Sequence, residues 1–326
     1  MSTPAPLDLN MPEPAAPRPM TPGLGTPELG MPELGMPGPG TPVAAPLDQL
    51  HVLRAELDGV DDHLHDTLMR RAGIVAQIAA LGVKGRTPLR PGREAAIIRR
   101  LLARHAGPFP RQGIVQVWRA LINSFTAQQR PMLITVCEPE GAGAATAVAR
   151  EHFGALTPLR VHRTPAQAIR EVSAGAATAA VLPVPAEGEA PAAAWWTALL
   201  HTDDPRIHVV ARLPFWSIRP EGAPRVQALV VAAAPPDPSG ADRSLLGLEL
   251  SLDVSRARLG AALAAAGFSA GPVILRRDPG APVAHALVDV DGFVTDADPR
   301  LAALQSVLRR PVVAGAYAVP LQEPLP

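Results

Sequence analysis

The 326-residue sequence contains a single cysteine, Cys137, and a single lysine, Lys84. A lone cysteine cannot form an intrachain disulfide, and because no base is evident nearby, Cys137 is expected to be a small core residue rather than a nucleophile. The N-terminus lacks the basic and apolar regions of a secretory signal. The longest apolar runs, such as 228–234, are far shorter than the ~20 residues that a membrane-spanning helix needs. We therefore expect a soluble, cytoplasmic protein that has no membrane partner.

The sequence also lacks an excess of charge of either sign. Its 30 Lys and Arg residues balance 30 Asp and Glu residues, so no net field draws the chain to nucleic acid. Its histidines offer no metal-ligand spacing, which favours surface or capping roles for His152, His162, His201 and His208. We expect no nucleic-acid partner, no metal and no cofactor.

The first 45 residues are dominated by Pro, Gly, Met and Ala and carry a five-residue repeat, seen in TPGLG, TPELG, MPELG and MPGPG. This composition predicts a disordered tail, because it cannot bury enough apolar area to order the chain. From Leu47 the pattern changes, and leucines, valines and isoleucines recur at spacings of three, four or seven. The spacing predicts one long helix over 47–81, followed by shorter helices over 92–107 and 111–129. Residues 46–130 should form an all-α domain.

The rest of the chain alternates between strand and helix patterns. Residues 132–184 read as a βαβαβ unit with a parallel sheet. A passage rich in Pro, Ala and Gly follows, and residues 235–326 then show the order β-α-β-β-α-β, which is typical of a ferredoxin-like fold. We therefore divide the chain into a tail (1–45), a helical domain (46–130), an α/β region (131–234) and a ferredoxin-like α+β domain (235–326).

The long helix needs a partner, since at 1.5 Å per residue it would span about 50 Å, more than a small domain can cover. Arg54 and Arg71 lie about 25 Å apart along it, too far to touch one small ligand in one subunit. In an antiparallel dimer, Arg54 of one chain could reach the Arg71 end of the other. Arg71 lies in register with the apolar stripe, which indicates either an anionic ligand or an internal ion pair.

Three separated sequence motifs in residues 47–130 together resemble a known protein family. They are LRAELDGVDDHLHDTLMRRAGIVAQI, REAAIIRRLL and INSFTAQQ, and in this order they resemble the AroQ-type chorismate mutases over residues 47–130. The resemblance implies an intertwined dimer that rearranges chorismate to prephenate, in aromatic amino-acid biosynthesis, without a cofactor. Two guanidinium groups would hold the two carboxylates of chorismate and order a flexible ether for reaction.

The resemblance also implies the site residues. Arg54 would come from the neighbouring subunit and Arg71 from the same subunit. The other members would be Lys84, Arg93, Glu94, Ser124 and Gln128. Taken alone, Arg93 and Glu94 would be read as a solvated helix N-terminus, whereas Ser124 and Gln128 share one helix face at i and i+4. The family lysine falls on Gly82 in this sequence, and Lys84 is the nearest lysine.

Residues 131–326 resemble, more faintly, the dehydratase and ACT portions of bifunctional chorismate mutase–prephenate dehydratases. The dehydratase Thr-Arg-Phe motif is replaced by Val226, Gln227 and Ala228, so we expect a degenerate, truncated dehydratase region without activity and an ACT-like regulatory domain. Whether the C-terminal region binds an amino-acid effector or a partner enzyme is an open alternative. Two alternatives also stay open: a bifunctional mutase and dehydratase, and a non-catalytic metabolite-binding regulatory protein.

Overall fold

The computed structural model describes residues 46–81, 89–139, 141–304 and 310–322. The chain divides into two compact units, Met1–Leu64 and His65–Pro326. In the first unit the described part is the N-terminal portion of helix α1 (Pro46–Ala80), which continues into the second unit. The tail predicted over 1–45 lies outside the described residues. No helix in the described ranges is both long enough and apolar enough to span a membrane.

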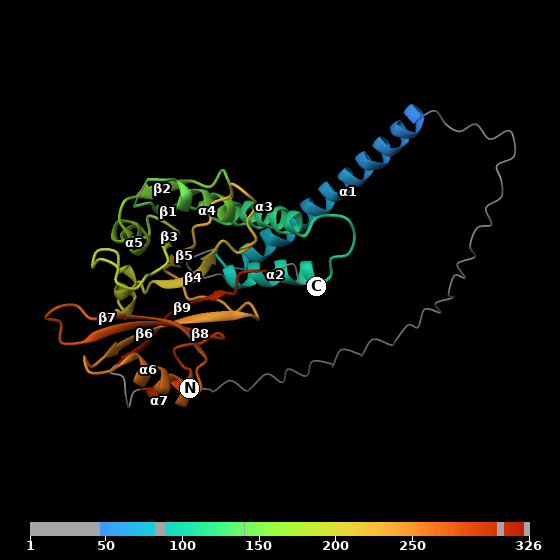
Figure 1. The fold of residues 1–326 in the computed structure, drawn as a ribbon. Helices are drawn as coiled ribbons and strands as arrows, with labels where there is room; N and C mark the ends of the chain where they lie inside the picture. The colour runs from blue at the N-terminus through green and yellow to red at the C-terminus, as the bar shows by residue number, and fades with distance from the viewer. Residues whose placement is uncertain (1–45, 82–88, 140, 305–309, 323–326) are drawn as a thin grey trace, which may run out of the picture. The chain divides into compact units, whose positions relative to one another are not determined.

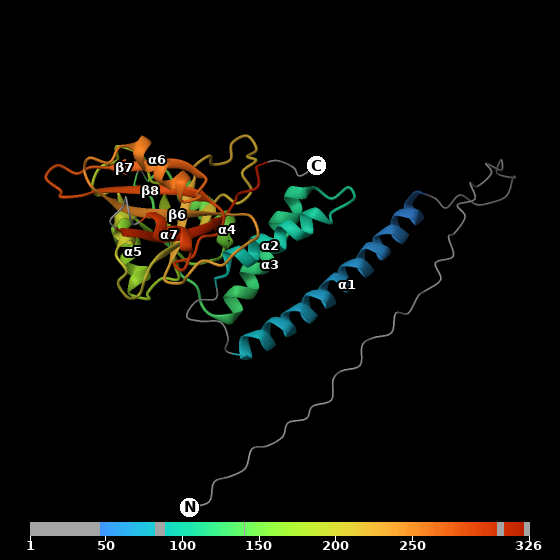
Figure 2. The same cartoon turned by 90° about the horizontal axis from the view of Figure 1, so that it is seen from below.

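The three predicted helices are confirmed. Helix α1 is followed by α2 (Pro91–Ala103) and α3 (Arg111–Gln129), and α2 ends somewhat earlier than its sequence pattern suggested. Figure 2 shows α2 and α3 side by side. Their apolar side chains, including Ile98 and Val115, pack in one cluster with Phe215 and Trp216 from the α/β part of the second unit.

The N-terminus of α2 is capped by a residue far away in the sequence. Arg90 at the N-cap position makes no side-chain cap. Instead, the carboxylate of Asp237 accepts hydrogen bonds from the backbone N–H of Gly92 at 3.0 Å and of Arg93 at 2.9 Å. A Cβ atom on Gly92 would lie 1.9 Å from the carbonyl oxygen of Asp237. Glycine is therefore required where the segment before the C-terminal strands crosses this helix.

The second unit contains a nine-stranded sheet with the order β2-β1-β3-β5-β4-β9-β6-β8-β7 (Figure 1). The predicted βαβαβ unit is confirmed, because β1 pairs in parallel with both β2 and β3. Its elements are β1 (Ile134–Cys137), α4 (Ala144–Phe153), β2 (Leu159–His162), α5 (Pro165–Ser173) and β3 (Ala179–Pro183).

The passage rich in Pro, Ala and Gly contains three elements that the sequence did not predict. They are the short 3-10 helix η1 (Trp195–Leu200), β4 (His208–Leu213) and β5 (Ala228–Ala232). Strand β5 pairs antiparallel with both β3 and β4. The sheet is therefore mixed rather than parallel beyond its first three strands.

The remaining strands have the ferredoxin-like arrangement that the sequence predicted. Strands β9, β6, β8 and β7 are neighbours in that order, and all their pairings are antiparallel. Helices α6 and α7 lie on one face of this part (Figure 1) and bury Leu259, Leu263 and Leu301 against it. The bounds are β6 (Asp242–Leu250), α6 (Arg256–Ala265), β7 (Ala270–Arg276), β8 (Ala284–Asp291), α7 (Pro299–Leu304) and β9 (Arg310–Ala318).

The two halves of the sheet join where β4 pairs with β9 through Val209 and Gly315. Gly315 has a φ of 146°, and a Cβ atom there would lie 2.2 Å from the carbonyl oxygen of Val209. Only glycine allows so close an approach of the two backbones. The boundary predicted after residue 234 falls between β5 and β6, inside one continuous sheet, and the division into separate domains stays a prediction.

Candidate active site

Helix α3 has two chemically different faces. Val115, Arg119, Ile122 and Thr126 are buried and recur at intervals of three or four residues. Val117, Ser124 and Gln128 are exposed, and Leu121 is half-buried. At 100° per residue these four residues lie on the opposite side of the helix. Ser124 and Gln128 therefore extend a partly apolar stripe on the face of α3 that the described residues leave exposed.

Arg71 of α1 lies against the flank of α3. Its guanidinium carbon lies 4.3 Å from the centre of the Phe125 ring, within the range of a cation–π contact. Its Nη1 atom is buried and has no hydrogen-bond partner among the residues that the structure describes. Burial lowers the pKa of Arg71, although a guanidinium remains charged at neutral pH. A half-buried cation with a buried, unused N–H donor next to Phe125 could bind an anionic group.

Glu94 of α2 is held on the other side of α3. Its Oε2 atom lies 2.7 Å from Nη1 of Arg119, and both side chains are buried. Burial raises the pKa of the Glu94 carboxyl, which Arg119 opposes and Asp237 reinforces. The structure therefore pairs Glu94 with Arg119 and does not bring it to the face that carries Ser124 and Gln128.

The other predicted site residues are more exposed. The Arg93 side chain is exposed, while its backbone N–H binds Asp237. The Ser124 hydroxyl donates to the carbonyl oxygen of Ala120 at 2.8 Å. Arg54 is exposed in the first unit and forms no ion pair with any described residue. Lys84 lies outside the described residues.

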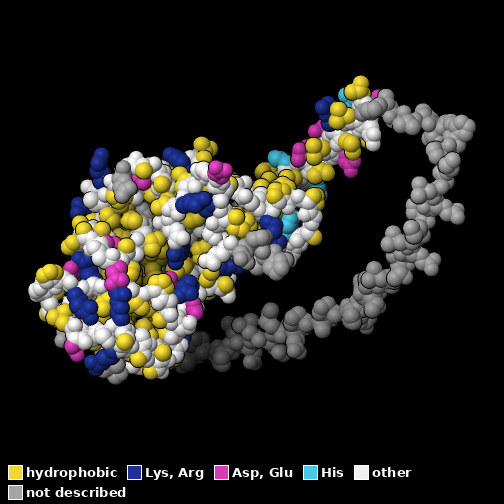
Figure 3. Space-filling view, viewed as in Figure 1, with side chains coloured by type: hydrophobic (Ala, Val, Ile, Leu, Met, Phe, Trp, Pro, Cys, Tyr) yellow, Lys and Arg dark blue, Asp and Glu magenta, His cyan; other side chains and the backbone are white. Residues whose placement is uncertain are grey.

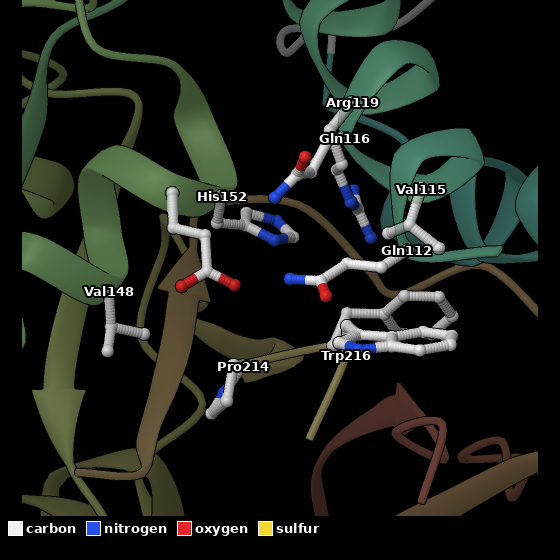
Figure 4. A pocket seen from close by; sticks show the side chains of 10 residues that line it. Gln112, Val115, Gln116, Arg119, Val148, His152, Pro214 and Trp216 are labelled. Atoms are coloured by element: carbon white, nitrogen blue, oxygen red, sulfur yellow. The ribbon is translucent and has the colours of Figure 1, made fainter. Parts of the chain in front are cut away.

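No sequence pattern indicated the small hollow between α3, α4 and the segment after β4. Figure 4 shows Gln112, Gln116 and His152 directed toward this space. His152 is buried, so the expected surface role is wrong, and it lies in the last turn of α4. Burial, and then the charge of Arg119, hold the pKa of His152 well below its ordinary value. Its burial has no local sequence signal, because it depends on contact between α3 and α4.

The hollow offers amide groups, a neutral imidazole and the indole of Trp216, whose Nε1 atom is buried without a partner among the described residues. It lies on the Arg119 face of α3, opposite Ser124 and Gln128. In the described ranges, no group of three or more His, Cys, Asp and Glu residues is placed to hold a metal ion.

Comparison with known proteins bears on the helical segment. Residues 53–130 match the family described as chorismate mutase type II. A bifunctional chorismate mutase/prephenate dehydratase from Pseudomonas aeruginosa is 31% identical over 150 residues, which are 43% of this chain and 40% of that protein. Its counterpart from Stutzerimonas stutzeri is 28% identical over 143 residues, covering 42% of this chain and 39% of that protein. The chain thus spans about two fifths of the length of these curated relatives.

A prephenate dehydratase from Arthrobacter aurescens, solved in complex with L-Phe, aligns with 57% of this chain and 90% of its own, at 15% identity and a TM-score of 0.44. The family match is the informative comparison. Residues 53–130 match the chorismate mutase type II family, and this match confirms the resemblance seen in the three sequence motifs.

Proposed function

We propose that this chain is a chorismate mutase, which rearranges chorismate to prephenate in aromatic amino-acid biosynthesis. The observation that carries the proposal is Arg71, a half-buried arginine whose buried Nη1 atom has no hydrogen-bond partner among the described residues, inside the segment that matches type II chorismate mutases. Chorismate is a dianion, and a desolvated guanidinium binds a carboxylate through charge-assisted hydrogen bonds. Fixing the carboxylates orders the flexible ether for an intramolecular rearrangement, so orientation supplies much of the catalysis.

The active form is proposed to be a homodimer built on α1. Leu53, Leu57 and Leu64 are 55%, 59% and 55% exposed, and Figure 3 shows apolar side chains at the surface along α1. None of the described residues covers this apolar stripe, and a second copy of α1 would cover it. In an antiparallel pairing, Arg54 of the partner would complete the site at Arg71.

The remaining site residues take supporting roles in this proposal. Ser124 and Gln128 face the site from α3, and Gln128 and Lys84 donate to the ether oxygen as charge develops on it. Arg93 is the exposed side chain through which α2 reaches the substrate. Glu94 holds α2 against α3 through Arg119, and no cofactor is involved.

For residues 131–234 we propose a dehydratase-like region without dehydratase activity, and for 235–326 an ACT-like domain. In support, Gln227, which stands at the position of the family arginine, accepts a hydrogen bond from Arg212 at 2.7 Å. The names of the curated relatives favour a second candidate, a bifunctional chorismate mutase/prephenate dehydratase. Incubation of the purified chain with prephenate at neutral pH decides between them. Phenylpyruvate formed faster than in an enzyme-free control would establish the second candidate.

The mutase proposal is tested by following chorismate disappearance with the full chain and with Arg54→Ala, Arg71→Ala and, as a matched exposed arginine on the same helix, Arg70→Ala. Loss of a charge-assisted bidentate contact should lower kcat/KM about 100-fold or more, and Arg70→Ala should stay active. Lys84→Ala measures whether that lysine contributes. Wild-type activity in both Arg54→Ala and Arg71→Ala would refute the proposed site.

Mixing the two inactive variants tests the shared site. A heterodimer of Arg54→Ala and Arg71→Ala places both lesions in one site and leaves the other site intact, so activity should partly return. Verified heterodimers that recover no activity would show that the two arginines do not come from different chains.

A further inference from the structure

Two hollows meet where the halves of the nine-stranded sheet join, and neither belongs to the proposed mutase site. Arg212 of β4 and Tyr317 of β9 line both. One hollow is an apolar slot, and the other is an open basic space. The slot is lined by Val184, Leu229, Leu245, Ile274 and Leu287.

A chain of hydrogen bonds fixes the polar end of the slot. Tyr317, only 2% exposed, donates its hydroxyl to Oδ2 of Asp289 at 2.5 Å and accepts from Nη1 of Arg212 at 3.0 Å. The other carboxylate oxygen of Asp289 accepts from Nε of Arg243 at 2.7 Å. Burial and Asp289 raise the pKa of Tyr317 to about 12. The phenol therefore stays protonated, and the Arg212 guanidinium is held in place over the slot.

The basic hollow carries an excess of positive charge. Arg212, Arg219, Arg225 and Arg243 line the basic hollow, and none of the described residues lining it is Asp or Glu. Arg219 is turned toward Glu151, with 2.7 Å between Nη2 and Oε2.

Arg212 and Arg225 are less well neutralised than Arg219 and Arg243. The nearest carboxylate to Arg212 is Asp289, at 3.7 Å, and Arg243 already binds that group at 2.7 Å. Arg225 is exposed and forms no ion pair with any described residue. Arg212 and Arg225 are thus cations without full countercharge, and they lie next to an apolar slot.

We propose that this junction binds small carboxylates that carry an apolar group. The carboxylate binds Arg212, with Arg225 contributing charge from the rim, and the apolar group enters the slot. A planar guanidinium held by fixed partners is suited to carboxylate recognition. The slot adds affinity by removing apolar surface from water.

Both halves of the sheet contribute to this site, Leu229 and Arg212 from one and Leu287 and Tyr317 from the other. Because a ligand would contact both halves, binding should stabilise their junction by mass action. The site is independent of the proposed mutase activity, since no residue assigned to that activity lines either hollow.

The test uses the full chain and 3-phenylpropanoate as the probe, followed by isothermal titration calorimetry and by thermal unfolding. We expect saturable binding and a rise in Tm. Two analogues separate the contributions: acetate keeps the charge without the apolar group, and 3-phenylpropan-1-ol keeps the ring without the charge. Each should bind at least ten-fold more weakly. Absence of saturable binding, or equal binding of the alcohol, would overturn the proposal.

Variants locate the binding. Arg212→Gln should weaken 3-phenylpropanoate binding at least ten-fold, and Arg225→Gln, at an exposed position where folding is not at stake, should weaken it several-fold. Arg163→Gln, at another exposed arginine, should bind as wild type. Arg71→Ala should also bind as wild type, which separates this site from the chorismate site. Unchanged affinity in both Arg212→Gln and Arg225→Gln, or loss of binding in Arg71→Ala, would show that the carboxylate binds elsewhere.

Discussion

Glu94 of α2 and Arg119 of α3 form a buried ion pair, with 2.7 Å between Oε2 and Nη1. The pair fixes α2 to α3, on the side of α3 away from Ser124 and Gln128. Arg119 also lies over the Phe215 ring, 5.0 Å from its centre, so the same side chain contacts the α/β part of the second unit.

Removing one member of this pair should be far more damaging than removing both. Glu94→Ala leaves Arg119 buried without a countercharge and should lower the free energy of unfolding by about 3–5 kcal/mol, whereas Glu94→Met with Arg119→Leu should recover much of the loss. Urea denaturation measures both. Asp253→Ala, in the exposed pair with Arg258, is the control and should change little. A Glu94→Ala protein as stable as wild type would contradict the buried pair.

Because His152 is buried, we predict that the free energy of unfolding depends on pH. Its pKa in the folded chain is well below the ordinary value of 6.5 because the imidazole is buried and faces Arg119. The unfolded chain therefore binds a proton that the folded chain excludes, and the stability from neutral His152 is complete above about pH 6.5 and lost as the pH falls below it.

The measurement is the free energy of unfolding between pH 7.5 and pH 5.5. Wild type should lose up to about 1.4 kcal/mol per pH unit more than His152→Gln below pH 6.5. His201→Gln, at an exposed histidine, should follow the wild-type slope. Parallel curves for wild type and His152→Gln would show that the buried imidazole does not control this dependence.

Gly92 and Gly260 should respond in opposite directions to substitution by alanine. A Cβ on Gly92 would lie 1.9 Å from a backbone oxygen of Asp237, whereas a Cβ on Gly260 meets nothing within 4 Å. Gly92→Ala should lower the free energy of unfolding by about 1–3 kcal/mol through overpacking. Gly260→Ala should raise it by roughly 0.5–1 kcal/mol, since alanine is the better helix former. Thermal unfolding of the two variants measures whether the stability falls in Gly92→Ala and rises in Gly260→Ala. An unchanged Tm in Gly92→Ala would show that Asp237 does not cap α2 rigidly.

The exposed stripe of α1 predicts an obligate dimer. Leu57→Glu combined with Leu64→Glu should abolish the dimer and reduce helicity together, because obligate dimers often have no stable folded monomer. Light scattering and circular dichroism measure the two effects. Asp62→Ala with Asp66→Ala, on the opposite face of the same helix, should leave both unchanged. A well-folded monomer of the leucine double variant would contradict an obligate dimer through α1.

The sequence alone predicted the elements whose signals are local. The spacing of apolar residues indicated α1, α2 and α3, and alternation of strand and helix patterns indicated β1 to β3 with their parallel pairing. Strands β4 and β5 were missed because they lie among prolines, alanines and glycines. Their strand conformation depends on pairing with β3 and β9, which sequence periodicity does not report.

Some features of the candidate site were likewise predictable from the sequence, and others depended on the tertiary structure. The motifs in residues 47–130 indicated a resemblance to the mutase family, which a family match over 53–130 confirms. Helix periodicity placed Ser124 and Gln128 on one face of α3, because it converts spacing into direction. Only the tertiary structure decided that Glu94 pairs with Arg119, that His152 is buried, and that Asp237 caps α2 from 145 residues further along the chain. These contacts join side chains that are distant in the sequence, and packing and desolvation, rather than local spacing, select which of the available charges meet.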